Sequence, residues 1–232
     1  MKLTHYLVVL LASQLWLVNV SAGSYECHAQ VTANENPNTA HGDYSAAIKF
    51  SEMKLIPAKV GFGATANRAD EITIVDGKLF LVGGDKGGLN VRNQPNPGEG
   101  AVVLVTGSPV AWSEAGKVDG VSSFDGLNFA LDNAVDDMKC DESAVVPFKI
   151  VGHAKSVQWT VVNGSNKEIG NISHNVDVII VGIYAKTNKE HLHMVKGYNI
   201  HAHVYLPTED VAGHIQEIDL ADGGMLYLPA EK

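Results

Sequence analysis

Hydrophobic and polar positions along the 232-residue chain predict a fold built mainly from β-strands. Two β-branched runs, 71–75 and 78–82, flank Asp76-Gly77, and this arrangement predicts a hairpin with a tight turn. Other apolar runs have the length and composition of strands. They lie at 101–106, 145–151, 156–162, 176–184, 198–206, 212–220 and 225–228.

Helical patterns are fewer. Apolar residues recur at helical spacing from 124 to 139, and Ser122 or Ser123 is available as the N-cap. A second pattern, in 43–54, predicts a short helix closed by Pro57. Many strands with one or two helices predict an α+β domain built on mixed or antiparallel sheets.

Three segments are predicted to lie outside this framework. Residues 1–22 have the basic start, apolar run and small-residue exit of a signal peptide, and we expect cleavage after Ala22. Residues 23–41 form a polar leader that is predicted to be loose, and the glycine-rich stretch 83–100 is predicted to be an exposed loop. The remaining segment, 42–232, is predicted to be one domain.

Net charge and cysteine content limit the classes of binding partner and the cellular compartment that we expect. The net charge of −9 argues against a nucleic acid or an anionic membrane as partner. No later segment is apolar for long enough to span a membrane, so we expect a secreted or periplasmic protein. Cys27 and Cys140 can pair in such a compartment or remain two thiols, and the sequence leaves both open.

Three histidines are spaced as metal ligands. His201 and His203 are two apart in a predicted strand, so both side chains face the same side. A turn at 206–211 returns the chain to His214, and Gly213 beside it is expected to leave room for a ligand. Three neutral imidazoles with an open position are typical of catalytic zinc. The alternative is that these are ordinary core or solvated histidines.

A second His-x-His pair, His191 and His193, lies in the polar stretch 187–196 and is interpreted as loop or strand end. Cupin barrels also carry such a pair, but they need a glutamate a few residues later and a distant histidine. The chain matches neither requirement well. We therefore place the predicted metal at the later pair and His214.

These residues resemble a known family. Gly197-Tyr198, then His201-x-His203, then ten residues and Gly213-His214-Ile215 resemble the metal motif of the α-acetolactate decarboxylases. That motif has a Gly-Tyr-His-x-His-Phe strand and returns with Gly-Gly-His-Val. The spacing from the first to the last histidine matches without a gap.

A second stretch carries the same resemblance. Residues 61–78 resemble the family's Gly-x-Gly-Thr-Phe, Leu-Asp-Gly-Glu and Leu-Asp-Gly sequence, and Glu71 falls on its active-site glutamate. Gly42-Asp43-Tyr44-Ser45 resembles its opening, so the resemblance covers most of 42–218.

The resemblance implies an acetolactate-decarboxylase-like fold and a Zn²⁺ ion, or another divalent metal, on His201, His203 and His214. It implies conversion of 2-acetolactate, or a similar small 2-hydroxy-3-keto acid, to acetoin and CO₂. In that reaction the metal acts as a Lewis acid and Glu71 relays a proton. Family members are commonly dimers, which implies a homodimer here.

The chain departs from the family at two places. Thr160 stands where the family has an arginine, and Lys155 is the catalytic residue expected to replace it, with Lys149 as the other candidate. The family's longer C-terminal segment, which carries a glutamate, has no clear counterpart, so Glu217 or Glu231 is the candidate for that role.

Three functions therefore remain open at this stage. The first is a secreted, zinc-dependent decarboxylase. The second is a relative that keeps the metal but has changed or lost the chemistry, such as a hydrolase of small esters. The third is an exported β-rich binding protein whose histidines are incidental.

Overall fold

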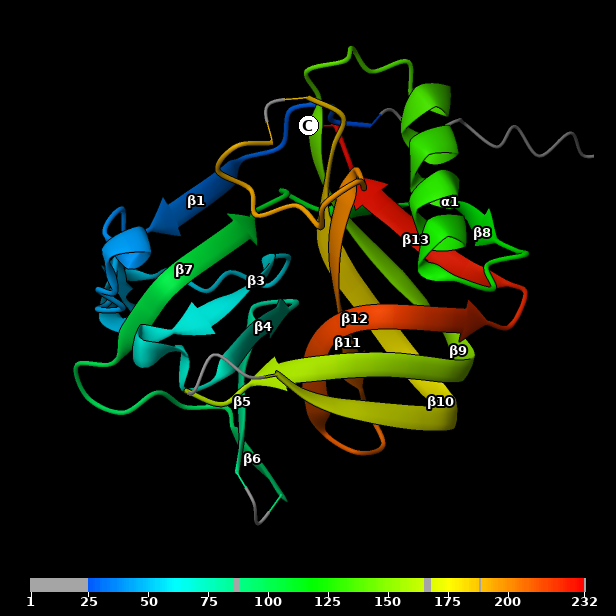
Figure 1. Ribbon diagram of the computed structural model, residues 1–232. Helices are drawn as coiled ribbons and strands as arrows, with labels where there is room; N and C mark the ends of the chain where they lie inside the picture. Colours follow the sequence, from blue (N-terminus) through cyan, green and yellow to red (C-terminus); the bar gives the residue numbers. More distant parts are fainter. Residues whose placement is uncertain (1–24, 86–87, 165–167, 188, 232) are drawn as a thin grey trace, which may run out of the picture.

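A computed structural model describes residues 25–231 except 86–87, 165–167 and 188, so the predicted signal peptide lies outside the described residues (Figure 1). One α-helix, α1 (Phe124–Asp137), accompanies the strands in this part of the chain. The strands are β1 (Val31–Glu35), β2 (Ile48–Lys49), β3 (Val60–Thr65), β4 (Glu71–Val75), β5 (Lys78–Asp85), β6 (Gly88–Arg92), β7 (Gly100–Gly107), β8 (Trp112–Val118), β9 (Val145–Val162), β10 (Glu168–Ala185), β11 (Ile200–Leu206), β12 (Val211–Leu220) and β13 (Gly224–Pro229).

The strands form two antiparallel sheets. The first sheet has the order β1-β7-β3-β4-β5-β6, with β2 added beside β7, and the second has the order β10-β11-β12-β9-β13-β8. In the second sheet β9 also pairs with β10, so β9, β10, β11 and β12 close into a ring of pairings. Together with the helix, this confirms the predicted α+β class with antiparallel sheets. No described helix is both long and apolar enough to cross a membrane.

Strand β4 lies between the two halves of the core. Ile72 and Ile74 pack into the core of the first sheet, whereas Val75 belongs to the large core shared with the second sheet. Successive residues of a strand face opposite sides, so Glu71 and Thr73 point to the same side as Val75. The alternation in β4 therefore directs two polar side chains toward the second sheet.

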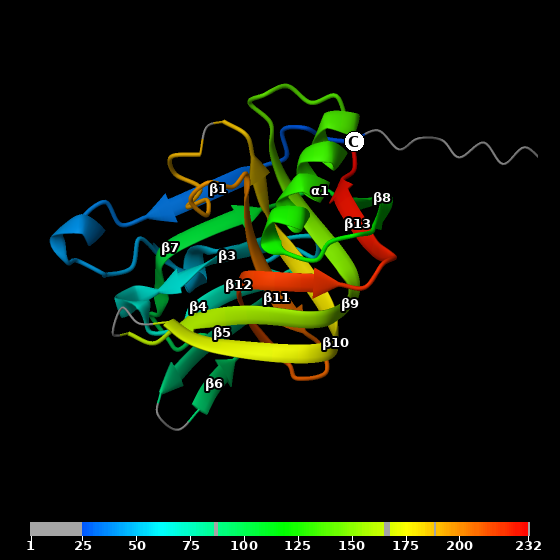
Figure 2. The same ribbon diagram turned by 45° about the vertical axis from the view of Figure 1, so that its right-hand side comes forward.

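The longest pairing joins β9 and β10 (Figure 2). Their register runs from Glu168 opposite Val162 to Ala185 opposite Val145. The two strands predicted at 145–151 and 156–162 are thus one strand that continues through Gly152. Continuous pairing with β10 satisfies the backbone along the whole length, which explains why no break occurs there.

Helix α1 confirms the predicted helix. The Ser123 side chain accepts the N–H of Gly126 at 3.1 Å and caps its first turn. The apolar stripe from Phe124 to Val135 is buried against the large core. The helix covers the second sheet, near β12 and β13 (Figure 1).

Three local predictions are wrong, for a shared reason. The stretch 43–54 forms β2 and a single 3₁₀ turn, Phe50–Glu52, in place of a short helix. The leader contributes β1, and the glycine-rich stretch contributes β6 together with the end of β5. Each segment pairs with a neighbouring strand, β7 or β5, and such tertiary pairing outweighs local propensity.

Cys27 and Cys140 form a disulfide, with their Cα atoms 5.5 Å apart. This settles the alternative that the sequence left open. The bond joins the N-terminal segment to the chain just after α1, across a sequence separation of 113 residues. Closing such a long loop restricts the unfolded chain and stabilises the fold.

Candidate metal centre

The three predicted histidines come together on β11 and β12. His201 and His203 face the same side of β11, while Ile200, Ala202 and Val204 are buried on the other. His214 lies directly opposite His203 in the β11–β12 register.

The imidazole rings form a compact triangle. Their centroids are 5.3 Å apart for His201–His203, 4.6 Å for His201–His214 and 5.5 Å for His203–His214. Phe62 of β3 stacks on the ring of His201 with a centroid distance of 3.8 Å. The first sheet thus closes the triangle from the opposite side.

The Nε2 atoms of these three histidines are buried and have no hydrogen-bond partner. Their Nδ1 atoms are all engaged: His201 Nδ1 donates to the carbonyl oxygen of His193 at 2.5 Å, and His203 Nδ1 lies 2.8 Å from Thr73 Oγ1. A proton held on Nδ1 leaves the Nε2 lone pair for a ligand. Outer hydrogen bonds of this type orient metal-binding histidines.

The third imidazole is held by Gln216, whose amide lies 3.2 Å from His214 Nδ1 and 3.1 Å from Thr160 Oγ1. An amide can be turned by 180° without changing its shape. With the Gln216 oxygen against Nδ1, the ring donates from Nδ1 and its Nε2 lone pair faces the other histidines. Thr160, at the family's arginine position, therefore supports His214 through Gln216.

Burial keeps these histidines neutral. Burial, followed by the proximity of His214, lowers the pKa of His201 to about 3. Burial likewise holds the pKa of His203 well below its ordinary value and lowers the pKa of His214. Neutral imidazole is the form that binds metal ions.

The donor set suits zinc, but the rings do not yet converge on one point. As the side chains stand, no group of three or more His, Cys, Asp or Glu residues in the described part of the chain is arranged to hold a metal ion. Three buried Nε2 atoms without partners nevertheless carry a free-energy cost that coordination would remove.

Glu71 faces this triangle from β4. Its Oε1 lies 3.5 Å from Nε2 of His203, and its Oε2 accepts the N–H of Val162 at 3.2 Å. Burial raises the pKa of Glu71 to about 8, against the lowering effects of the Val162 N–H and the nearby Arg68. A carboxyl group with this pKa holds a proton near neutral pH and can deliver it.

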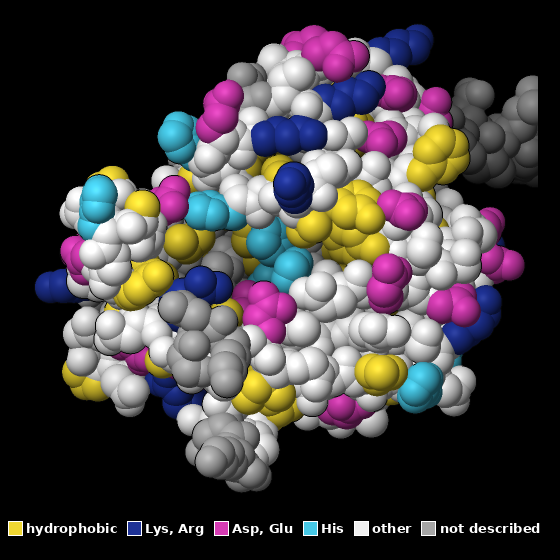
Figure 3. Space-filling view, in the orientation of Figure 1, with side chains coloured by type: hydrophobic (Ala, Val, Ile, Leu, Met, Phe, Trp, Pro, Cys, Tyr) yellow, Lys and Arg dark blue, Asp and Glu magenta, His cyan; other side chains and the backbone are white. Residues whose placement is uncertain are grey.

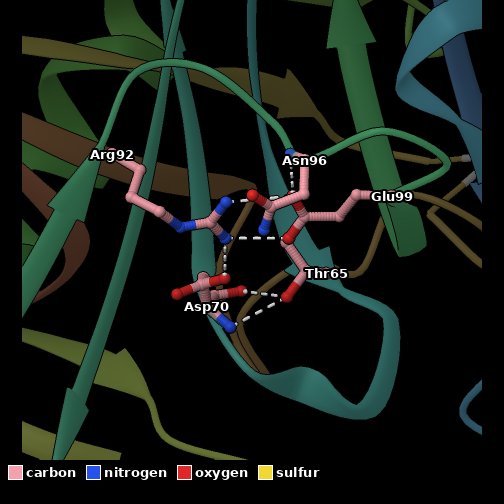
Figure 4. Close-up of polar contacts among 5 residues, drawn as sticks. All are labelled: Thr65, Asp70, Arg92, Asn96 and Glu99. Atoms are coloured by element: carbon pink, nitrogen blue, oxygen red, sulfur yellow. Dashed lines mark hydrogen bonds and ion pairs between the residues drawn. The ribbon is translucent and has the colours of Figure 1, made fainter.

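A salt-bridge network braces the turn before Glu71 (Figure 4). Arg92 Nη2 lies 2.6 Å from Asp70 Oδ2 and 2.8 Å from Glu99 Oε1, and Nη1 donates to Glu99 Oε2 at 3.0 Å. The N–H of Asp70 donates to Thr65 Oγ1 at 2.8 Å. Because Asp70 and Arg92 are largely buried, this network fixes the end of β3 and the start of β4.

A cavity of about 360 Å³ opens onto the site. It is lined by His201 and His214 and by four charged side chains, Glu35, Arg68, Glu71 and Glu168. Figure 3 shows the histidines gathered at the centre of this face with acidic and basic side chains around them. This volume suits a small organic molecule.

Several residues predicted from the sequence lie elsewhere. Lys155 points into solvent and pairs with Asp219 at 3.1 Å, and Lys149 pairs with Asp76 at 2.9 Å, so neither is among the cavity-lining residues. Glu217 accepts the N–H of Phe124 at the start of α1. These side chains have local partners that the sequence pattern does not reveal.

Glu231 is exposed near the end of the chain and is likewise absent from the cavity lining. Gly213 has a packing role in place of the expected one. A Cβ atom there would lie 2.6 Å from the Trp159 ring and 2.7 Å from the Thr160 carbonyl oxygen. The close approach of β12 to β9 therefore requires glycine, independently of any ligand.

The sequence pattern missed three residues of the site. Thr73 follows Glu71 by two positions in a strand, and this spacing could have revealed it. His193, interpreted as loop or strand end, orients His201 through its carbonyl oxygen and lines the cavity, and its Nε2 lies 3.3 Å from Glu35 Oε2. No sequence pattern marked Arg68 as a site residue, because only the fold brings its segment to the histidines.

Comparison with known proteins supports the fold. No family model matches the chain, and no curated protein matches it in sequence. An acetolactate decarboxylase from Bacillus subtilis subspecies spizizenii is similar in structure, with a TM-score of 0.67 and 15% identity over 88% of this chain and 87% of that one. The α-acetolactate decarboxylase of Bacillus subtilis strain 168 has a TM-score of 0.67 at 14% identity, over 88% and 86% of the two chains.

A Staphylococcus aureus protein of unknown function, similar to α-acetolactate decarboxylase, has a TM-score of 0.65 at 12% identity over 87% of this chain and 86% of that one. The protein has the acetolactate-decarboxylase-like fold. Identities this low establish the architecture alone, because unrelated chemistries share folds.

Proposed function

We propose that the protein is a secreted or periplasmic zinc-dependent lyase that decarboxylates 2-acetolactate, or a similar small 2-hydroxy-3-keto acid, to acetoin and CO₂. Its partner is a small molecule, and its metal ligands are His201, His203 and His214. The Cys27–Cys140 disulfide supports an oxidising compartment.

One observation carries this proposal. The Nε2 atoms of three neutral histidines lack hydrogen-bond partners, and two of these histidines, His201 and His214, line a cavity together with Glu71. The same pairing of three histidines with a glutamate is what the resemblance to the decarboxylases implies. The similarity in fold to two acetolactate decarboxylases supports this proposal.

Each part of the site has a task in this reaction. The histidines would hold the ion, and a bound zinc supplies a Lewis acid that polarises the substrate's keto and hydroxyl oxygens. When the bond to the carboxylate breaks and CO₂ leaves, the electron pair stays with the substrate. Glu71 then gives its proton to the carbon that lost CO₂, and solvent returns a proton to Glu71.

A second function has its own support. Glu35 and Glu168 also line the cavity, and Thr160 occupies the family's arginine position, where it contacts Gln216. Two further carboxyl groups and a threonine at the arginine position favour a relative that keeps the metal with altered chemistry, such as hydrolysis of small esters. A metal-bound water beside Glu71 would suit that reaction.

The test begins with metal analysis of the purified protein, followed by an assay for acetoin from racemic acetolactate. We expect about one zinc per chain and acetoin release that stops after chelation and returns with zinc. Zinc without acetoin, in an assay where an authentic decarboxylase succeeds, would favour the altered relative. No zinc at any concentration would leave the exported binding protein.

A further inference from the structure

The protein has only two arginines, Arg68 and Arg92. The guanidinium of Arg92 is committed to Asp70 and Glu99 in the brace before β4. Arg68 lines the cavity beside the histidines and lies close enough to Glu71 to lower its pKa. No other Lys or Arg is among the described residues that line this cavity.

The backbone around Arg68 is fixed in an unusual conformation. Asn67 and Arg68 have positive φ angles of 58° and 52°, which residues other than glycine adopt uncommonly. The N–H of Asn67 donates to Tyr44 O at 2.8 Å, and the carbonyl oxygen of Arg68 accepts the N–H of Gly164 at 2.7 Å. Such conformations persist where the surroundings impose them, and they are frequent at binding sites.

The charges around the cavity favour an anion once a metal is bound. A divalent ion on the histidines would add two positive charges to a lining that holds Arg68 together with Glu35 and Glu168. Without the ion, the same side chains leave the cavity negative. A monoanion of cavity size therefore complements the metal-loaded site, and a carboxylate matches the fork of a guanidinium.

We propose that Arg68 binds the carboxylate of a small 2-hydroxy acid in this cavity. The inference rests on the proposed function for its metal, and it places the carboxylate beside the turn between β3 and β4. Lys155, the residue that the sequence suggested for this charge, lies outside the cavity and pairs with Asp219.

Binding of two probes to zinc-loaded protein, measured by calorimetry, tests this. The first is 2-hydroxy-2-methylpropanoate, which has the hydroxy acid but no keto group and so does not react. The second is 3-hydroxy-3-methylbutan-2-one, in which a methyl group replaces the carboxylate of acetolactate. The proteins compared are wild type, Arg68→Gln, Arg68→Lys and Lys155→Gln, with zinc content and thermal unfolding measured for each.

We expect Arg68→Gln to weaken binding of the hydroxy acid by about 10- to 100-fold, the range for a charge-assisted hydrogen bond, and to leave the neutral probe unchanged. Arg68→Lys should lie between, since lysine keeps the charge without the fork. Lys155→Gln, which removes the same charge outside the cavity, should bind both probes as wild type does.

Equal hydroxy-acid affinity in wild type and Arg68→Gln would overturn the inference, and so would equal losses for both probes. If Arg68→Gln loses zinc or unfolds, the test uses Arg68→Lys. That variant should then bind the hydroxy acid more weakly than wild type and the neutral probe equally well. This binding test is independent of the acetoin assay that tests the proposed function. A protein that makes no acetoin yet binds the hydroxy acid through Arg68 disproves the decarboxylase proposal alone.

Discussion

The two walls of the cavity are built in different ways. The histidine wall comes from adjacent strands of the second sheet, with His203 opposite His214 in one register. The acidic wall comes from the first sheet, where Glu71 and Thr73 lie some 130 positions earlier in the chain than His203. One wall is set by local pairing, and the other is set by the packing of two sheets.

This difference separates two requirements of the site. Holding a metal depends on the histidine wall, which a single hairpin arranges. Turnover also depends on Glu71, whose position relies on the brace at Asp70 and Arg92. A relative can therefore keep one wall and lose the other, and the variants below test each wall separately.

The largest effect is expected from the histidine wall. His203→Ala removes a fully buried ligand and should weaken zinc binding by more than about 100-fold, the upper range for changes to outer partners. Zinc affinity measured by competition with a chromogenic chelator checks this. His191→Ala, an exposed imidazole of the other pair, is the matched control and should bind as wild type does. Equal affinities in the two variants would remove His203 from the site.

On the acidic wall, Glu71→Gln should lower acetoin formation by about 100- to 10,000-fold, since it removes a general acid, while zinc content stays near one per chain. Steady-state kinetics and metal analysis of the same sample distinguish a loss of turnover from a loss of zinc. Glu231→Gln, an exposed carboxyl group, should leave both quantities unchanged. Wild-type turnover in Glu71→Gln would exclude it as the proton donor.

The two walls also meet at the hydrogen bond between His203 Nδ1 and Thr73 Oγ1. Thr73→Val keeps the side-chain shape, removes the hydroxyl and should weaken zinc binding by about 10- to 100-fold. Thr73→Ser restores the hydroxyl and should recover most of that loss. If valine and serine variants bind zinc alike, the hydroxyl does not orient His203.

The smallest effect concerns pH in metal-free protein, where the two walls respond in opposite senses. The pKa of Glu71 is raised to about 8, so its contribution to stability is present below about pH 4.5 and is lost as pH rises to 8. The pKa values of the histidines are lowered, so their contribution is present above about pH 6.5 and is lost as pH falls.

Comparing Glu71→Gln with wild type isolates the first of these trends. Over the two units from pH 5.5 to 7.5, the variant should gain about 2 kcal/mol of unfolding free energy relative to wild type. Urea unfolding in the presence of a chelator at both pH values measures it. A difference that does not change with pH would mean that Glu71 is not protonated in the folded protein.

Much of the fold was predictable because its signals are local. Asp76-Gly77 between β-branched runs specifies the β4–β5 hairpin, where both residues have positive φ. Spacing and a serine cap specify α1. The edge strands β1 and β6 were not predictable, because their polar, glycine-rich segments become strands only by pairing with β7 and β5.

The site divides in the same way. The sequence by itself determined the histidine wall, because two-residue periodicity and one tight return between β11 and β12 suffice to gather His201, His203 and His214. The resemblance implied Glu71 as well, but only the tertiary structure decided that Arg68 lines the same cavity and that Lys155 does not. Packing of one sheet on another leaves no periodic trace in the chain, so it had to be seen in three dimensions.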